Sequence, residues 1–160
     1  MESKKSSFTR PVRHDQRGFT LIEILVTVII LAIGLLGIAG LQLTGLKYNQ
    51  GAYHRSQVIV LTNDITDRMR ANRDAALAGA YEITIGTDAN GASCDGAVAI
   101  CDPSAIANAD LAAWKQALAD NLPSGDGSIE RIGNVFTITI QWDDSRGQQD
   151  PKTMAVETIL

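Results

Sequence analysis

The sequence predicts an α+β protein in which a long N-terminal helix carries a small antiparallel β-sheet head on its second half. Three patterns predict this fold class. An apolar run that suits a membrane helix occupies residues 19–46, and an amphipathic helical pattern continues through residues 47–80. Residues 81–160 then hold a second amphipathic stretch and segments that alternate as β-strands do. The head is therefore expected to form from residues 81–160.

The first element is expected to cross a membrane. Glu23 is the only charged residue between Arg17 and Lys47. As an α-helix, residues 19–46 would rise about 42 Å, enough to cross a hydrocarbon core of roughly 30 Å. Basic residues outnumber acidic ones before this run, so the positive-inside rule predicts a cytoplasmic N-terminus and a translocated head. No small-residue cleavage site follows the run, as it would in an ordinary secretory signal.

Glu23 is unusual because an ionisable side chain inside a membrane segment is costly and is by default a candidate for function. The alternative is a shallow position near the headgroups, where the carboxylate would stabilise the positive end of the helix dipole. The residues alone leave both explanations open.

The segment Gly-Phe-Thr-Leu-Ile-Glu at residues 18–23, between a short basic leader and an unbroken apolar helix, resembles the class III signal of type IV prepilins and pseudopilins. The resemblance implies a pilin-like fold. It also implies that prepilin peptidase removes residues 1–18 by cutting between Gly18 and Phe19, and then N-methylates Phe19. In this family the residue that matches Glu23 pairs with the terminal amine of a neighbouring subunit. Phe19 and Glu23 are four residues apart and share a helix face, so pairing within one subunit is the alternative.

A second, looser resemblance lies at the end of the amphipathic helix. The Arg-Met-Arg-Ala-Asn-Arg element at residues 68–73, soon followed by Gly79 and Tyr81, resembles the minor pilins called type IV pilus modification protein PilV. A tryptophan-bearing helix that ends in Leu-Pro (residues 114–123) and a strand that ends in Trp-Asp-Asp (residues 142–144) fit the same subfamily. Apart from the resemblance, the mixed charges indicate a solvated helix face.

The head is expected to begin with an irregular segment from residue 79 to about residue 108, which includes a short strand at residues 81–85. A second helix is expected to open at Asp110, capped by Asn108 or Asp110, and to end at Leu122-Pro123. Strands are expected at residues 128–132, 135–142 and 153–160, with a tight turn at residues 133–134. The predicted core stripes are Val58, Leu61, Ile65 and Met69; Leu111, Trp114, Leu118 and Leu122; and Phe136, Ile138, Ile140 and Trp142.

Cys94 and Cys101 bracket an eight-residue loop. In an extracytoplasmic compartment two cysteines this close predict a structural disulfide, which by loop closure is worth about 2.5 kcal/mol. The only histidines are His14 and His54, so a zinc site lacks ligands, and no metal site is predicted. No segment fits a calcium-loop template either.

The charge balance and the absence of catalytic motifs exclude several classes of function. The net charge is −4, and loss of the leader, with five positive and two negative residues, would change it to −7. Such acidity disfavours nucleic-acid binding. Asp143 and Asp144 beside Arg146 are typical turn formers, and no nucleophile, phosphate-binding glycine loop or cofactor site is indicated. We expect no enzyme.

The residues and the resemblance together imply a minor pilin, which helps prime type IV pilus assembly, sits at or near the filament tip, and supports twitching motility and adhesion. The implied partners are prepilin peptidase, other minor pilins, the major pilin and a tip adhesin. The implied location is the inner membrane before assembly and the cell surface afterwards. A minor pseudopilin of a type II secretion system is the closest alternative, and a signal-anchored binding protein that never polymerises is a more distant one.

Overall fold

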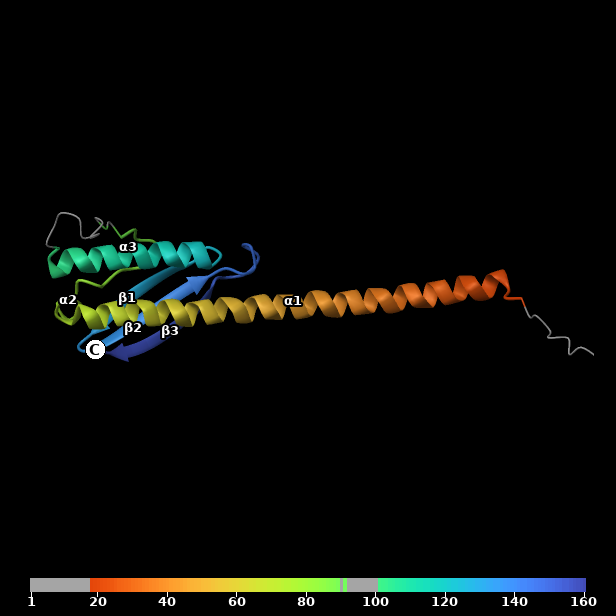
Figure 1. Cartoon of the computed structure of the whole chain (residues 1–160), viewed down its shortest axis with the longest axis horizontal. Coiled ribbons are helices and arrows are strands. Elements are labelled where there is room, and N and C mark those ends of the chain that lie inside the picture. The colour runs from red at the N-terminus through yellow and green to blue at the C-terminus, as the bar shows by residue number, and fades with distance from the viewer. Residues whose placement is uncertain (1–17, 90, 92–100) are drawn as a thin grey trace, which may run out of the picture. The chain divides into compact units, whose positions relative to one another are not determined.

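The computed structural model describes residues 18–89, 91 and 101–160 (Figure 1). It divides into two compact units, residues 1–45 and residues 46–160. Its helices are α1 (Leu21–Ala71), α2 (Arg73–Leu77) and α3 (Pro103–Asn121), and its strands are β1 (Asp126–Ile132), β2 (Val135–Trp142) and β3 (Lys152–Ile159). A long N-terminal helix and a three-stranded antiparallel sheet confirm the predicted α+β fold.

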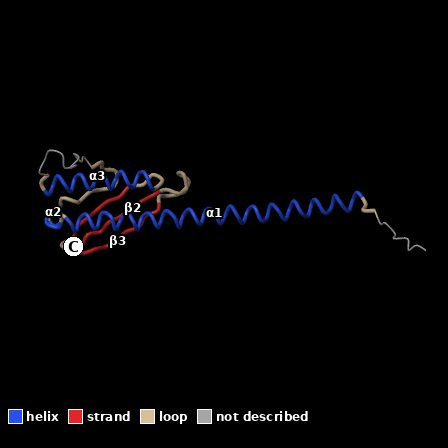
Figure 2. The backbone as a smooth tube through the Cα atoms, in the orientation of Figure 1, coloured by secondary structure: helices blue, strands red, loops and turns tan. Residues whose placement is uncertain are grey.

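The sheet has the order β1-β2-β3, and both neighbouring pairs are antiparallel (Figure 2). Ile138 in the central strand lies opposite Ile129 on one side and Val156 on the other. Gly133 has a φ of +65°, which a tight turn between β1 and β2 requires and which glycine adopts without strain. β2 has the predicted bounds, whereas β1 begins two residues earlier than expected and β3 is shifted by one residue.

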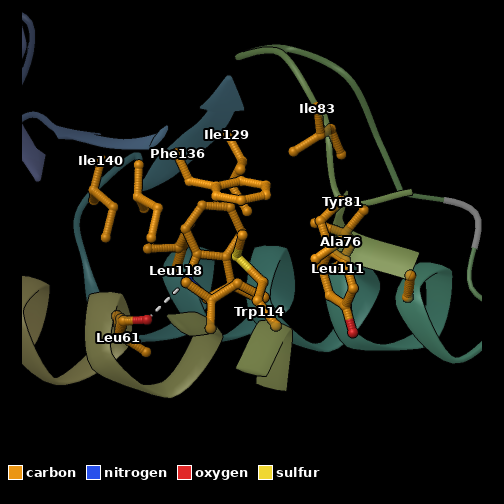
Figure 3. Packing of buried hydrophobic residues seen from close by; sticks show 14 of the residues in the cluster. Leu61, Ala76, Tyr81, Ile83, Leu111, Trp114, Leu118, Ile129, Phe136 and Ile140 are labelled. Atoms are coloured by element: carbon orange, nitrogen blue, oxygen red, sulfur yellow. Dashed lines mark hydrogen bonds between the residues drawn. The ribbon is translucent and has the colours of Figure 1, made fainter. Parts of the chain in front are cut away.

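The core of residues 46–160 lies where the head portion of α1 and α3 pack against one face of the sheet. All twelve residues of the three predicted stripes are buried, with exposed fractions of 7% or less. Trp114 lies at the centre of this core, and its indole Nε1 donates a hydrogen bond to the carbonyl oxygen of Leu61 at 3.0 Å (Figure 3). Gly127 permits the close approach of β1 to α3, because a Cβ there would lie 2.5 Å from Cη2 of Trp114.

The predicted start of the second helix is wrong. α3 begins at Pro103 rather than Asp110, and its N-cap is Asp102, whose carboxylate accepts a hydrogen bond from the amide of Ala105 at 2.7 Å. Asp at the N-cap and Pro in the first turn together are a strong start signal. The prediction passed over this signal because the preceding residues are rich in turn formers. Seven more residues are therefore helical, and Ala107 among them is buried.

The predicted short strand at residues 81–85 is also wrong. Only an isolated bridge joins Ile83 to Ile129 of β1. Gly79 and Gly86, with φ values of +89° and +78°, turn the chain on either side of this bridge. The long helix likewise ends earlier than residue 80, since α1 stops at Ala71 and the short α2 follows after Asn72.

Candidate functional site

The first candidate site is the start of α1. The carbonyl oxygen of Thr20 accepts hydrogen bonds from the amides of Glu23 (3.0 Å) and Ile24 (3.3 Å), which closes the first turn. Glu23 lies in this turn, where the helix dipole favours a negative charge. Phe19 is 79% exposed. Among the described residues, the Glu23 carboxylate has no hydrogen-bond or ion-pair partner, so it is available to another chain.

The unit that contains this turn presents an apolar surface. Every large apolar side chain from Phe19 to Leu46 is at least 47% exposed. Two of the three threonines in this stretch satisfy their hydroxyls within the helix: Thr27 donates to the carbonyl of Ile24 at 2.8 Å, and Thr44 donates to that of Gly40 at 3.0 Å. α1 is the one helix among the described residues that is long and apolar enough to cross a membrane. Such a surface is unstable in water and needs lipid or other apolar helices around it.

The second candidate site is the set of polar contacts at the end of α1. Arg68 donates to Asp64 from Nε and to Asp110 of α3 from Nη1, both at 3.0 Å. The second carboxylate oxygen of Asp110 accepts the hydroxyl of Tyr81 at 2.6 Å. Burial, together with the hydrogen bond to Asp110, raises the pKa of the Tyr81 phenol, which therefore stays neutral. These contacts join α1, α3 and the segment after α2.

The remaining residues of the 68–73 element extend the same junction. The side chain of Asn72 donates to the carbonyl oxygen of Pro103 at 2.7 Å and to the hydroxyl of Tyr81 at 3.3 Å. Arg73 donates to the carbonyl oxygen of Leu160 at 3.0 Å, and Met69 is fully buried. In this element Arg70, Ala71 and Arg73 are exposed, so the solvated-face interpretation holds for only half of its residues. The element fixes both α3 and the C-terminus to the end of α1.

A third polar cluster closes the other end of the sheet. Lys115 of α3 forms an ion pair with Asp126 at the start of β1 and also donates to the carbonyl oxygen of Thr84. Partial burial opposes ionisation of Asp126, but hydrogen bonds from Lys115, the Gly86 amide and its neighbour's amide outweigh it and lower the pKa of this carboxyl. Asp126 is thus a charged anchor for the irregular segment before α3.

The carboxylates of the β2–β3 turn have structural roles. Asp143 accepts hydrogen bonds from the amide of Ser145 at 2.7 Å and from that of Gly147, and bonds from the Ser145 hydroxyl and these amides lower the pKa of Asp143. Asp144 forms an ion pair with Lys152 at 2.6 Å. Within the described ranges, no three His, Cys, Asp or Glu side chains group as metal ligands.

Two predicted sites involve residues outside the described ranges. Cys94 is one of them, so its pairing with Cys101 stays a prediction; Cys101 directly precedes the Asp102 cap of α3. The leader before Gly18 is the other. Sequence reasoning missed Asp110 as the acceptor that joins Arg68 to Tyr81, because its helical spacing made it look like a cap. Its one detectable signal was an acidic residue just before the apolar stripe that begins at Leu111.

Comparison with known protein families adds two matches. Residues 13–39 match the prokaryotic N-terminal methylation motif, and residues 40–114 match the type IV pilin Tt1218 family. The two matches are contiguous and cover the start of α1, the rest of that helix, and the chain as far as Trp114. No curated protein and no solved structure matches the chain.

Proposed function

Because this chain belongs to the type IV pilin superfamily, we propose that it is a minor pilin that helps prime type IV pilus assembly at or near the filament tip. The observation that carries the proposal is an unpartnered carboxylate, Glu23, at the start of the exposed apolar part of α1. The resemblance of residues 68–73 to the PilV subfamily supports a minor rather than a major subunit. Twitching motility and adhesion would be the cellular readouts.

Processing would complete the site. Prepilin peptidase would remove residues 1–18 and leave Phe19 with a cationic amine, which is then N-methylated. Within an apolar helix bundle an unpaired amine and an unpaired carboxylate are each costly, so pairing Glu23 of one subunit with Phe19 of the next removes both costs. The competing pairing within one subunit leaves no charge to guide assembly.

The other segments take roles that suit this proposal. Residues 19–46 would anchor the subunit in the inner membrane and later pack in the filament, and residues 47–80 would link this helix to the head. Residues 81–160 would form the periplasmic head that selects neighbouring minor pilins, the major pilin or a tip adhesin. A disulfide between Cys94 and Cys101 would brace the loop before α3.

Substitution of Glu23 by glutamine tests the proposal, because it keeps the size of the side chain and removes its charge. We expect the variant to be processed to a methylated Phe19, as judged by intact mass, yet to be absent from sheared filaments. Glu157→Gln, an exposed change of the same chemistry in β3, is the matched control and should enter filaments normally. Normal incorporation of the Glu23 variant would refute the pairing.

A minor pseudopilin of a type II secretion system shares the leader, the helix and the head plan. A deletion strain separates the two machines. Loss of twitching motility with normal protein secretion supports the pilus assignment, whereas the opposite result assigns the subunit to secretion.

A further inference from the structure

Most basic side chains of the head have a polar partner, but a few do not. Within residues 46–160, as far as the structure describes them, three cations have no hydrogen-bond or ion-pair partner: Lys47, Arg55 and Arg146. The other basic residues are engaged, most in ion pairs and one with a carbonyl oxygen: Arg68, Arg70, Arg73, Lys115, Arg131 and Lys152. The unpaired cations are all exposed.

The three unpaired cations gather at one end of the head. A Cβ added to Gly51 would lie 3.9 Å from Oδ2 of Asp144, so the β2–β3 turn lies against α1 at this level. Lys47 precedes Gly51 by four residues and shares its helix face. Arg146 belongs to the same turn, and Arg55 follows Gly51 by one helical turn. Lys47 also comes directly after the apolar run, so Lys47 and Tyr48 are the residues of this group nearest in sequence to the membrane segment.

The acidic residues of the same turn cancel only part of these charges, because Asp143 stays ionised and Asp150 is a further carboxylate. Asp144 is neutralised by Lys152, and Asp143 accepts hydrogen bonds from amides and a hydroxyl of the turn itself. Asp150 is the remaining exposed carboxylate there. Arg146 has a φ of +59°, a left-handed backbone conformation that is uncommon for a residue with a Cβ, and its side chain is exposed.

We propose that Lys47, Arg55 and Arg146, together with Tyr48, form a juxtamembrane surface that binds the anionic phospholipid headgroups around α1. Guanidinium and ammonium groups bind phosphate esters through charge-assisted hydrogen bonds. Tyr48 is 75% exposed and lies on the face of Arg55, seven residues before it, and tyrosine is enriched at the level of headgroups. The surface holds the head on the membrane before the subunit enters a filament.

The proposal rests on the membrane anchoring that is part of the proposed function. A Lys or Arg near an anionic bilayer favours contact by about fivefold. Asp143 and Asp150 offset part of the three cations, so the expected factor for the surface as a whole is about fivefold, and removing all three cations should lower it by on the order of 100-fold. This factor applies to the equilibrium between a head that lies on the membrane and one that is lifted from it. The same contacts would have to break when the subunit is extracted into a filament.

The test places the full chain in nanodiscs of phosphatidylcholine alone or of an equimolar mixture with phosphatidylglycerol. A trace of lipid with a nitroxide on its headgroup broadens the NMR signals of amides that approach it. We expect strong broadening at Gly147 and Gln148 in the mixed discs, and little in the neutral discs. The triple variant Lys47→Gln, Arg55→Gln and Arg146→Gln should abolish the difference, and so should about 1 M salt, which screens such charges.

A control variant separates local contact from net charge. Arg70→Gln, Arg73→Gln and Arg131→Gln remove the same number of charges from the opposite end of the head and should leave the broadening unchanged. Equal broadening in both lipid mixtures, or no loss in the first triple variant, would overturn the juxtamembrane surface. A chain that does not insert into the discs at all would instead refute the membrane-anchored subunit.

Discussion

Replacing Trp114 by phenylalanine measures how strongly the centre of the core holds α3 to α1. The indole is fully buried and donates to the carbonyl oxygen of Leu61 at 3.0 Å. Phenylalanine removes this hydrogen bond, which costs about 1 kcal/mol. It also fills only part of the space of the indole, and the lost burial costs about 2 kcal/mol more. We therefore expect the free energy of unfolding of the head to fall by about 3 kcal/mol.

Urea unfolding of the full chain in detergent micelles provides the assay. Trp142 remains in the variant, is 3% exposed, and reports unfolding of the head through its fluorescence. Tyr53→Phe serves as a control, because this side chain is 57% exposed and its hydroxyl bonds to no described residue. The control should change the free energy of unfolding by less than about 0.5 kcal/mol.

A loss for Trp114→Phe no larger than that of the control would refute the reasoning. It would mean that the core closes around the smaller ring, and that the polar contacts of Arg68 and Lys115 hold α3 in place. A larger loss of stability, with the same slope of the free energy of unfolding against urea concentration, would show that unfolding is still two-state. It would also support a core that does not relax around the smaller ring.

The polar contacts of the head and the predicted disulfide yield three further predictions. Tyr81→Phe removes a hydroxyl bonded to the Asp110 carboxylate at 2.6 Å and should cost about 2 kcal/mol in the same titration; an unchanged midpoint would contradict this. Folding lowers the pKa of Asp126, so its ionised carboxylate stabilises the folded head. This contribution to the free energy of unfolding is fully present above the pKa of the unfolded chain, about 3.9, and is lost as the pH falls through the pKa of the folded state. Lys115→Gln should therefore reduce the fall in the free energy of unfolding at acid pH. An unchanged pH dependence would refute the ion pair. Cys101→Ser, which removes the predicted disulfide, should lower the free energy of unfolding by about 2.5 kcal/mol. If an alkylating reagent modifies both cysteines of the unsubstituted, unreduced protein, the disulfide is disproved.

The elements predicted best are those whose hydrophobic period is regular. Phe136, Ile138 and Ile140 alternate without a break, and β2 has the predicted bounds. The stripe from Val58 to Met69 follows helical spacing and is buried throughout. In both cases one face of a single element is sufficient to determine its conformation, so local sequence carries the information.

The errors arise where the conformation depends on a distant partner. Ile83 lies in a segment with strand-like alternation, yet it pairs with β1 through one bridge because the chain turns away at Gly86. Asp110 looks like a helix cap, but its carboxylate receives Arg68 from α1, a residue 42 positions earlier. No local pattern encodes such a contact. The start of α3 was different, since Asp102-Pro103 was a local signal that the surrounding turn formers obscured.

The division of polar contacts along the chain supports an assembly role for α1. In the head, Arg68, Tyr81 and Lys115 each satisfy their polar groups within the same chain, whereas the buried Nδ1 of His54 and Nε1 of Trp142 have no partner among the described residues. In the first half of α1 the threonine hydroxyls are also satisfied, but the apolar side chains and the Glu23 carboxylate find no partner among the described residues. Lipid can cover the apolar side chains, but it offers no counter-charge to a carboxylate below the headgroups. A second subunit with a free amine, as proposed, would supply both, so Glu23, rather than any residue of the head, is the substitution expected to separate processing from assembly.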